Sequence, residues 1–137
     1  MAPVCPYILH ISHVPFLRTE DISPFLVKQM LCPDRLEPYG IDECWLDVTR
    51  SSSLKGDGLL IAQEISRRMK SELGITVSVG VSFNKIFAKL GSDYKKPDAI
   101  TTMYKSEFKQ KAWSLPVADL LYVGKSTNRK LALFGEN

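Results

Sequence analysis

The chain has few cysteines and no long apolar run, and these two absences exclude several classes of protein. Only three of its 137 residues are cysteines, an odd number without the paired spacing of a zinc site: Cys5, Cys32 and Cys44. We therefore expect no disulfide framework, as in a protein kept in a reducing, cytoplasmic compartment. No apolar stretch approaches the ~20 residues of a membrane span, and the N-terminus lacks the basic and apolar segments of a secretory signal. We expect no membrane partner.

Histidine is also scarce. His10 and His13 lie three residues apart, a spacing that would suit a metal-binding pair on a helix. Pro15 follows too closely for a regular helix, and no third ligand is near. We expect a structural or surface role for both histidines.

Acidic residues are sparse in the C-terminal half of the chain. Residues 84–130 hold ten lysines and arginines against four aspartates and glutamates, whereas residues 1–37 hold three against four. A basic half favours a polyanionic partner such as nucleic acid or nucleotide phosphates. A solvated basic surface with no such partner is the alternative.

The first 35 residues are predicted to form an irregular arm. Six of the eight prolines fall within the first 38 residues, and proline interrupts both helices and sheet ladders. The best helix candidate in the arm is 23–31, where Ser23 can cap and Pro24 suits the first helical position. The only extended apolar candidate is Tyr7 to Ile11, which could pair with a sheet.

Regular structure is expected from Leu36 onward. The clearest helix is 57–73, where apolar residues recur every fourth position and Gly74 can end the helix. The clearest strand is 75–82, where branched residues alternate with small polar ones. The other predicted elements are strands at 36–39, 44–49 and 99–102, a helix at 82–90 capped by Ser82 and ended by Gly91, and a helix at 106–113. This order indicates an α+β domain, with an antiparallel or mixed sheet and helices on one face.

Two adjacent acids precede an ordered set of lysines, which is the arrangement that a magnesium–triphosphate site needs. Asp42 and Glu43 lie between two predicted strands, and neighbouring strand residues point to opposite faces. Both acids can share one Mg²⁺ only if the backbone bends there, which Gly40 permits. Lys96 precedes Pro97 on a loop and could meet phosphate charge.

The segment 115–135 is predicted to be a helix, a glycine hairpin and a second helix. The turn at Gly124 and Lys125 would expose backbone N–H groups able to bind a phosphate, with Arg129 and Lys130 adding charge. A plain helical hairpin without a ligand has the same spacing.

These motifs together resemble the Y-family translesion DNA polymerases of the bacterial polymerase IV type. Residues 39–43, Tyr-Gly-Ile-Asp-Glu, are similar to the family's Tyr-Ser-Ile-Asp-Glu palm motif, with Gly40 in place of serine. Residues 80–89 and 92–97 resemble its second palm motif, and 120–135 the start of its helix-hairpin-helix thumb. The resemblance implies a ferredoxin-like polymerase palm at 36–114, the start of the thumb at 115–137, and an arm at 1–35 that does not match the family.

The resemblance also implies roles for individual residues. Asp42 and Glu43 would ligate Mg²⁺, with Glu43 as the catalytic residue, and Lys96 would bind the incoming nucleoside triphosphate. Gly124, Lys125 and Lys89 would bind DNA phosphates. For Lys89 and its neighbour Lys85 a purely structural role is an equal alternative. The partners would be primer–template DNA, a deoxynucleoside triphosphate and, for the full-length protein, a sliding clamp.

Asp47 and Asp93 are not expected to be ligands. Asp47 lies beyond the turn and is interpreted as structural, and Asp93 as the partner of a nearby lysine.

The chain also departs from the family pattern. The family begins with a strand carrying a further metal-binding aspartate, followed by helical fingers, and residues 1–35 are not expected to supply these. Most of the thumb and the little-finger domain are expected to be absent as well.

Three hypotheses follow from the resemblance and the departures. The first is a polymerase fragment that is inactive alone, because two carboxylates leave Mg²⁺ under-coordinated. The second is a non-catalytic module that binds DNA or a polymerase. The third is a truncated or mispredicted reading frame with an unrelated N-terminal arm.

Overall fold

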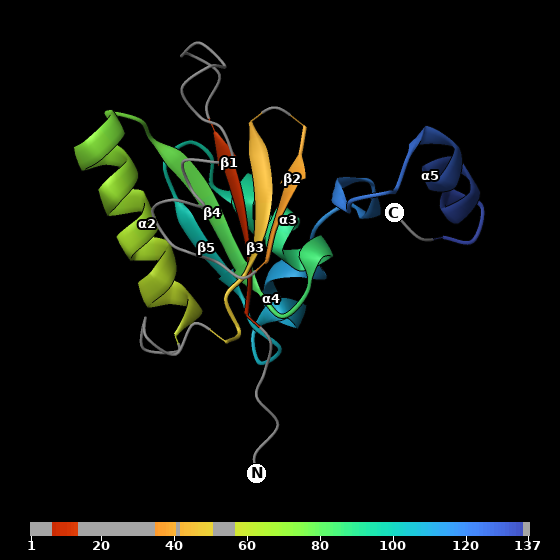
Figure 1. The fold of residues 1–137 in the computed structure, drawn as a ribbon. Coiled ribbons are helices and arrows are strands. Elements are labelled where there is room, and N and C mark those ends of the chain that lie inside the picture. Colours follow the sequence, from red (N-terminus) through yellow and green to blue (C-terminus); the bar gives the residue numbers. More distant parts are fainter. Residues whose placement is uncertain (1–6, 14–34, 41, 51–56, 136–137) are drawn as a thin grey trace.

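The computed structural model describes residues 7–13, 35–40, 42–50 and 57–135 of the chain. A five-stranded mixed sheet forms its centre, and helices lie beside the sheet (Figure 1). The predicted helix at 23–31 falls outside the described residues. None of the helices in the described part of the chain combines the length and apolar character that a bilayer span requires.

The strand order in the sheet is β2-β3-β1-β4-β5. Its members are β1 (Ile8–His13), β2 (Arg35–Tyr39), β3 (Glu43–Asp47), β4 (Val77–Ser82) and β5 (Ile100–Met103). Only the pair β4–β5 is parallel; the other three pairs are antiparallel. The α+β mixed sheet predicted from the sequence is therefore confirmed.

The N-terminal strand β1 lies in the middle of this sheet. It pairs with β3 on one side and β4 on the other, so both of its edges are hydrogen-bonded. The prediction of an irregular arm is therefore wrong for residues 8–13, whereas the suggestion that Tyr7 to Ile11 joins the sheet is confirmed. The prolines mark the flanks of the strand and do not interrupt it, because residues 7–13 contain none.

Helix α2 (Gly58–Leu73) covers one face of the sheet and forms the main core with it. Asp57 caps the helix by accepting a hydrogen bond from the Leu59 N–H, and Gly74 ends it in the left-handed conformation. Its apolar stripe packs against alternate residues of β1, β3 and β4, as the fourfold spacing predicted. The fully buried members of this core include Leu9, Leu46, Ile61, Ile65, Met69, Val79 and Val81.

Helix α3 (Lys85–Tyr94) covers the opposite face, so the prediction of helices on one face only is wrong. A Cβ atom on Gly80 of β4 would lie 1.8 Å from the Ala88 carbonyl oxygen, which shows how closely helix and strand approach. Gly91 does not end α3 as predicted, because it is part of this contact: its Cβ position is 3.3 Å from the Gly80 Cα. Asn84, not Ser82, caps the helix, through a hydrogen bond from the Phe87 N–H.

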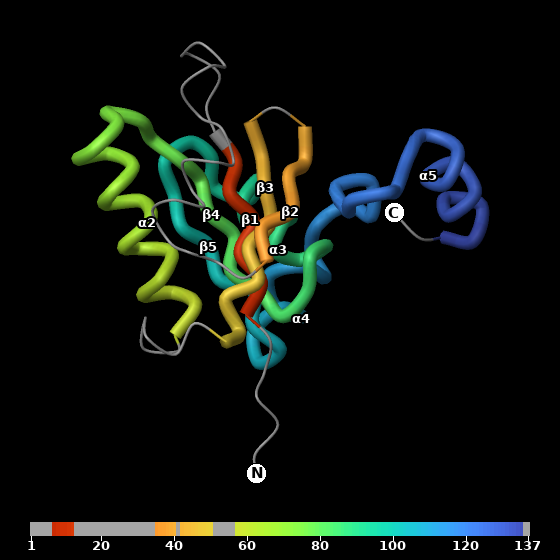
Figure 2. Tube along the Cα trace, viewed as in Figure 1, coloured from red at the N-terminus to blue at the C-terminus, as the bar shows by residue number. Residues whose placement is uncertain are grey.

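After β5 the chain forms α4 (Phe108–Ala112), whose Phe108 ring contacts the rings of Phe83 and Phe87. The segment that follows projects away from the sheet (Figure 2) and contains the 3₁₀ turn η2 (Val117–Asp119) and α5 (Lys125–Ala132). The second predicted helix is present as α5, but the first, over 115–121, is reduced to the single turn η2. Pro116 lacks a backbone N–H, and Leu120 after η2 has an extended backbone, so the helical conformation does not continue beyond η2.

Candidate active site

The two adjacent acids lie where β2 turns into β3. Gly40 has a φ of +70°, so the backbone bends here as expected from the sequence. Glu43 is the first residue of β3 and points toward α3, on the same face as Trp45, which donates a hydrogen bond to the Lys85 carbonyl. The Asp42 carboxylate lies back over the turn, with Oδ1 4.0 Å from the Cβ position of Gly40. No hydrogen bond or ion pair joins it to another described residue. That the two acids share one pocket therefore stays a prediction.

The Glu43 carboxylate is surrounded by three nitrogen groups. Lys89 Nζ on α3 lies 2.9 Å from Glu43 Oε1, and Lys96 Nζ lies 3.8 Å from the same oxygen. His10 Nε2 on β1 lies 3.5 Å from Oε2. Only 15% of the Glu43 side chain is exposed, so these groups act with little screening by water. The spatial link between Glu43 and Lys96 that the motif spacing implied is present.

The nitrogen groups keep Glu43 ionised. Burial raises the pKa of the carboxyl, but contact with the His10 ring, the hydrogen bond from Lys89 and the charge of Lys89 outweigh it and bring the pKa down to about 2. The pKa of Lys89 is raised, because its hydrogen bonds to Glu43 and Asp93 and their charges outweigh the effect of burial. The pair is therefore fully charged at neutral pH.

Asp93 completes the cluster from the next turn of α3. Its carboxylate lies 3.0 Å from Lys89 Nζ and 2.6 Å from Lys96 Nζ. The interpretation of Asp93 as the partner of a nearby lysine is thus confirmed. Lys89 contacts two carboxylates and is 16% exposed, so its ammonium is engaged inside the protein.

His10 is a member of this site that the sequence did not indicate. Its side chain is fully buried, and Nδ1 lies 2.8 Å from Ser92 Oγ of α3. Burial lowers the pKa of His10, although contact with Glu43 partly opposes this, so the ring is neutral. A proton on Nε2 suits the geometry, because an unprotonated Nε2 would place a lone pair against the Glu43 carboxylate. His10 and His13 lie on strand β1, so they do not form the metal-binding pair on a helix that their spacing would suit. The burial of His10 agrees with the structural role expected for it.

Ser12 is the second residue that the sequence did not indicate. In the strand register it lies beside Glu43 of β3 on one side and Ser78 of β4 on the other. Ser12 and Ser78 are each 1% exposed, and neither hydroxyl has a hydrogen-bond partner among the described residues. A polar but uncharged position thus adjoins Glu43 on the central strand.

Asp42 and Glu43 do not complete a Mg²⁺ site by themselves in the described part of the chain. Mg²⁺ prefers an octahedron of oxygen ligands, commonly including more than one carboxylate. In the described part of the chain no three His, Cys, Asp or Glu side chains gather in a way that could hold a metal ion. Glu43 already accepts from Lys89, and the strand position beside it carries the hydroxyl of Ser12.

Two further candidates have structural contacts. Lys85 forms an ion pair with Glu37 of β2, and its Nζ lies 5.5 Å from the centre of the Trp45 ring. Asp47 accepts a hydrogen bond from the Thr49 N–H just after β3, in line with the structural role expected of it.

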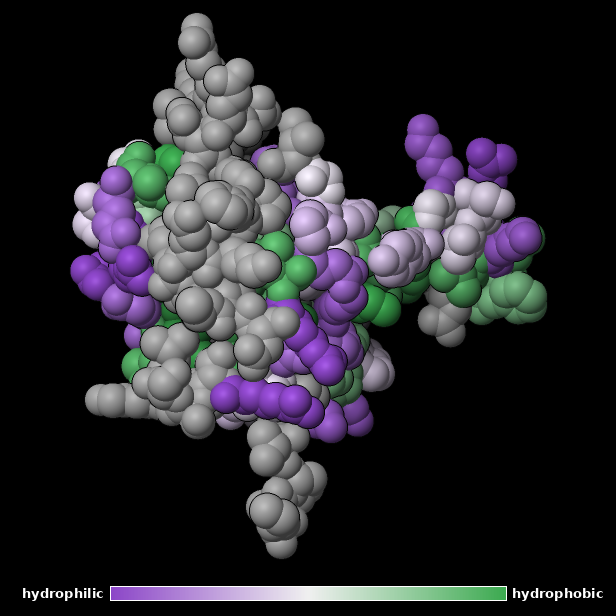
Figure 3. All heavy atoms as spheres, in the orientation of Figure 1, coloured by the Kyte–Doolittle hydropathy of each residue, from purple (hydrophilic) through white to green (hydrophobic). Residues whose placement is uncertain are grey.

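The predicted phosphate-binding turn lies outside this cluster. Gly124 is the N-cap of α5, and Lys125 follows as its first residue. Lys125, Arg129 and Lys130 are exposed, and none forms an ion pair with another described residue. In Figure 3 the projecting segment shows hydrophilic side chains at its outer tips.

Comparison with known proteins gives consistent matches. The model of the impB/mucB/samB family matches residues 5–93, which includes part of the arm that was expected to lie outside the family. The chain is 64% identical over 98 residues to the DNA polymerase IV of Acetivibrio thermocellus, covering 72% of this chain and 25% of that protein. It is 50% identical over 97 residues to the DNA polymerase IV of Clostridium acetobutylicum, covering 70% and 24%. The chain thus spans about a quarter of the length of these relatives.

Solved structures share the fold. A post-insertion binary complex of Dbh DNA polymerase matches with a TM-score of 0.71 and 28% identity, over 83% of this chain and 33% of that one. A DinB family error-prone DNA polymerase from Sulfolobus solfataricus matches with a TM-score of 0.74, over 95% of this chain and 56% of that one. The identity of the second pair is 18%, so it supports the fold alone.

Proposed function

Because the chain belongs to the impB/mucB/samB family of Y-family DNA polymerases, we propose that it is the palm, with the start of the thumb, of a polymerase IV-type translesion polymerase. The parent reaction is template-directed nucleotidyl transfer during damage bypass, with primer–template DNA and a deoxynucleoside triphosphate as partners. The palm comprises β1 and residues 36–114, and residues 115–137 begin the helix-hairpin-helix thumb. A cytoplasmic location and a sliding-clamp contact of the full-length protein belong to the same proposal.

The contact between Glu43 and Lys96 carries this proposal. An acid at a strand end and a lysine on the loop after the neighbouring helix, 3.8 Å apart, set a carboxylate beside a phosphate-binding charge. Here Glu43 is the catalytic carboxylate, Asp42 and Glu43 are the Mg²⁺ ligands, and Lys96 binds the triphosphate. Bound Mg²⁺ would supply activation of the attacking hydroxyl and stabilisation of the leaving pyrophosphate.

We further propose that this chain alone is inactive. The reason is the composition of the site: Lys89 and His10 hold Glu43, and the central strand presents the Ser12 hydroxyl, not a carboxylate, beside Glu43. Primer extension by the purified chain, with Mg²⁺ and all four deoxynucleoside triphosphates, is the direct test. We expect no extension. Extension that disappears in Glu43→Ala would overturn the inactivity.

A metal titration tests the reason separately. Ser12→Asp adds a carboxylate beside Glu43, so its melting temperature should rise with Mg²⁺, whereas Ser12→Asn, of similar size, should not respond. The unsubstituted chain should also show no response. A Mg²⁺-dependent rise in the unsubstituted chain that Asp42→Asn removes would show that the two native acids suffice.

A second candidate function is a DNA-binding module without catalysis. The observation that favours it is the set of exposed basic side chains on α5, headed by Lys125, none of which forms an ion pair with a described residue. Salt-dependent DNA affinity that survives Asp42→Ala but falls in Lys125→Ala would support it. Absence of affinity at low ionic strength would exclude it.

A further inference from the structure

Four aromatic rings form a continuous cluster beside α4. Phe108 contacts Phe83 at 5.6 Å, Phe87 at 5.2 Å and Trp113 at 5.6 Å between ring centres. The three phenylalanines are half-buried, whereas Trp113 is 70% exposed. Phe108, which itself packs on Phe83 and Phe87, therefore supports one side of the indole and leaves much of its surface open to a partner.

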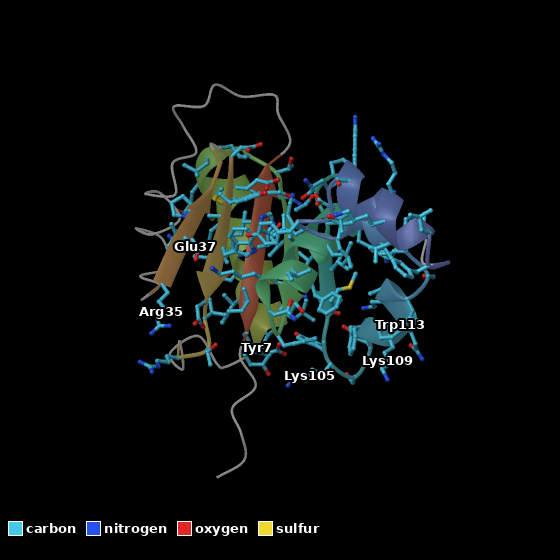
Figure 4. The ribbon with its side chains drawn as sticks, turned by 90° about the vertical axis from the view of Figure 1, so that its right-hand side faces the viewer. Tyr7, Arg35, Glu37, Lys105, Lys109 and Trp113 are labelled. Atoms are coloured by element: carbon cyan, nitrogen blue, oxygen red, sulfur yellow. The ribbon has the colours of Figure 1, made fainter. Side chains whose placement is uncertain are left out.

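Two lysines flank the ring cluster without an acidic partner. Lys105 Nζ lies 5.5 Å from the centre of the Phe83 ring, and Lys109 Nζ lies 5.6 Å from that of Trp113. Neither forms an ion pair with a described residue. The neighbouring acid, Glu107, is neutralised by Lys111 at 2.9 Å. Figure 4 shows Lys105, Lys109 and Trp113 along one edge of the molecule.

The ring cluster lies at the other end of the sheet from Glu43. Glu43 pairs with Ser12 at one end of the sheet. At the other end Asp47 pairs with Ile8, and Ile8 pairs in turn with Ser82 of β4. Phe83 follows Ser82 directly. A strand rises about 3.3 Å per residue, so Glu43 and Asp47, at the two ends of β3, are roughly 13 Å apart. The ring cluster is therefore separate from the candidate active site.

We propose that Phe83, Phe87, Phe108 and Trp113, with Lys105 and Lys109, form a binding site for single-stranded nucleic acid. An exposed indole on a fixed aromatic base gives a platform for stacking a nucleobase, and the two uncompensated ammonium groups meet the adjacent phosphates. The charge of this surface favours one occupant: aromatic rings flanked by two lysines that form no ion pair with a described residue complement a strand with bases and phosphates. The site depends on no residue of the catalytic cluster.

The test uses two probes with the same number of phosphates. One is a fluorescein-labelled oligothymidylate of about eight nucleotides, and the other is an abasic strand of equal length. The thymidylate should bind roughly tenfold more tightly, because one stacked base contributes about that factor. Trp113→Ala should remove this difference, and Trp113→Phe should retain most of it. Equal affinity for both strands, or an unchanged difference in Trp113→Ala, would overturn the site.

Salt dependence tests the lysines. Lys105→Gln and Lys109→Gln should each flatten the plot of log affinity against log salt by about 0.7 if each neutralises one phosphate. Arg67→Gln, an equal charge change on α2, which packs on the other face of the sheet, is the matched control and should alter affinity far less. An equal loss of affinity in the control would mean that only the net charge of the chain matters, and it would contradict the proposal.

Intrinsic fluorescence gives an independent readout. The chain has two tryptophans, of which Trp45 is 3% exposed and Trp113 is 70% exposed. Oligothymidylate should quench the emission of the unsubstituted chain but not that of Trp113→Phe. Binding of a protein partner at this face, with no response to either strand, would overturn the nucleic-acid assignment. Asp42→Ala should leave all these results unchanged, so the site and the polymerase proposal can fail separately.

Discussion

Lys89 on α3 lies 2.9 Å from Glu43 on β3, and this ion pair joins the helix to the sheet at a position where both side chains are about 15% exposed. Such a pair differs from the surface pair of Lys85 and Glu37, whose side chains are 47% and 56% exposed. The first holds a carboxylate that is largely withdrawn from water, and the second is screened by solvent.

Loss of the Lys89 ammonium should therefore destabilise the fold. We expect Lys89→Gln to lower the free energy of unfolding by about 1–3 kcal/mol, because Glu43 loses its nearest cation. Urea unfolding at neutral pH, followed by circular dichroism, measures this. Lys85→Gln is the matched control and should change stability by less than about 1 kcal/mol. Equal effects of the two substitutions would contradict the structural role of Lys89.

Stability should fall as the pH is lowered. The pKa of Glu43 is about 2 in the folded chain and near its ordinary value of 4.5 when unfolded, so its contribution is complete above pH 4.5 and is lost as the pH falls toward 2. The pKa of His10 is lowered from 6.5, so below pH 6.5 the unfolded chain binds a proton that the folded chain does not. Both effects lower the free energy of unfolding as the pH falls.

The two contributions can be separated by substitution. Unfolding free energies measured from pH 7 downward should show a decline that begins near pH 6.5 and steepens below 4.5. Glu43→Gln should remove the second part, of the order of 3 kcal/mol, and retain the first, which should grow because Glu43 no longer raises the pKa of His10. Parallel curves for the two chains would show that Glu43 does not titrate as proposed.

Gly80 should tolerate no side chain. Its Cβ would lie 1.8 Å from the Ala88 carbonyl, so Gly80→Ala must push α3 off the sheet, and we expect a loss of at least about 3 kcal/mol. Gly124 is the control, because no atom lies within 4 Å of its Cβ position and its φ is −81°. Thermal unfolding should show a large fall for Gly80→Ala and little change for Gly124→Ala. A small effect at Gly80 would mean that α3 can shift.

The thiol of Cys44 should resist alkylation. Burial, with a smaller effect from the Glu43 charge, raises its pKa to about 12, and the side chain is 4% exposed. Iodoacetamide at about pH 8 should leave Cys44 unmodified in the folded chain and modify it in urea, as peptide mapping by mass spectrometry would show. Rapid modification without denaturant would indicate that β3 opens locally.

The parts of the fold that local pattern determines were predictable. Helix α2 follows from a fourfold apolar spacing with an N-cap and a glycine end, and β4 follows from strict alternation. Gly91 was misread as a helix end, because its function is a contact with Gly80 that only the tertiary structure creates. Strand β1 was predicted only in part, as the extended candidate Tyr7 to Ile11, because His10 and Ser12 look polar, yet both are buried.

The proximity of Glu43 and Lys96 was predictable, because their spacing matches a known motif, whereas the role of Asp42 stays a prediction. His10 and Ser12 were not predictable, since their position beside Glu43 depends on the register of a strand thirty residues upstream. The pairing of Lys89 with Glu43 likewise depends on which way α3 faces. The sequence alone left the role of Lys89 open between phosphate binding and support of the fold.

The central position of β1 affects the order in which the sheet can assemble. This strand leaves the ribosome before either of the segments that it must join, one some thirty residues later and the other nearly seventy. Until β4 has been synthesised, the nascent chain carries an unsatisfied strand edge, the kind of surface that chaperones protect. Closing the sheet is therefore a late, long-range event in synthesis.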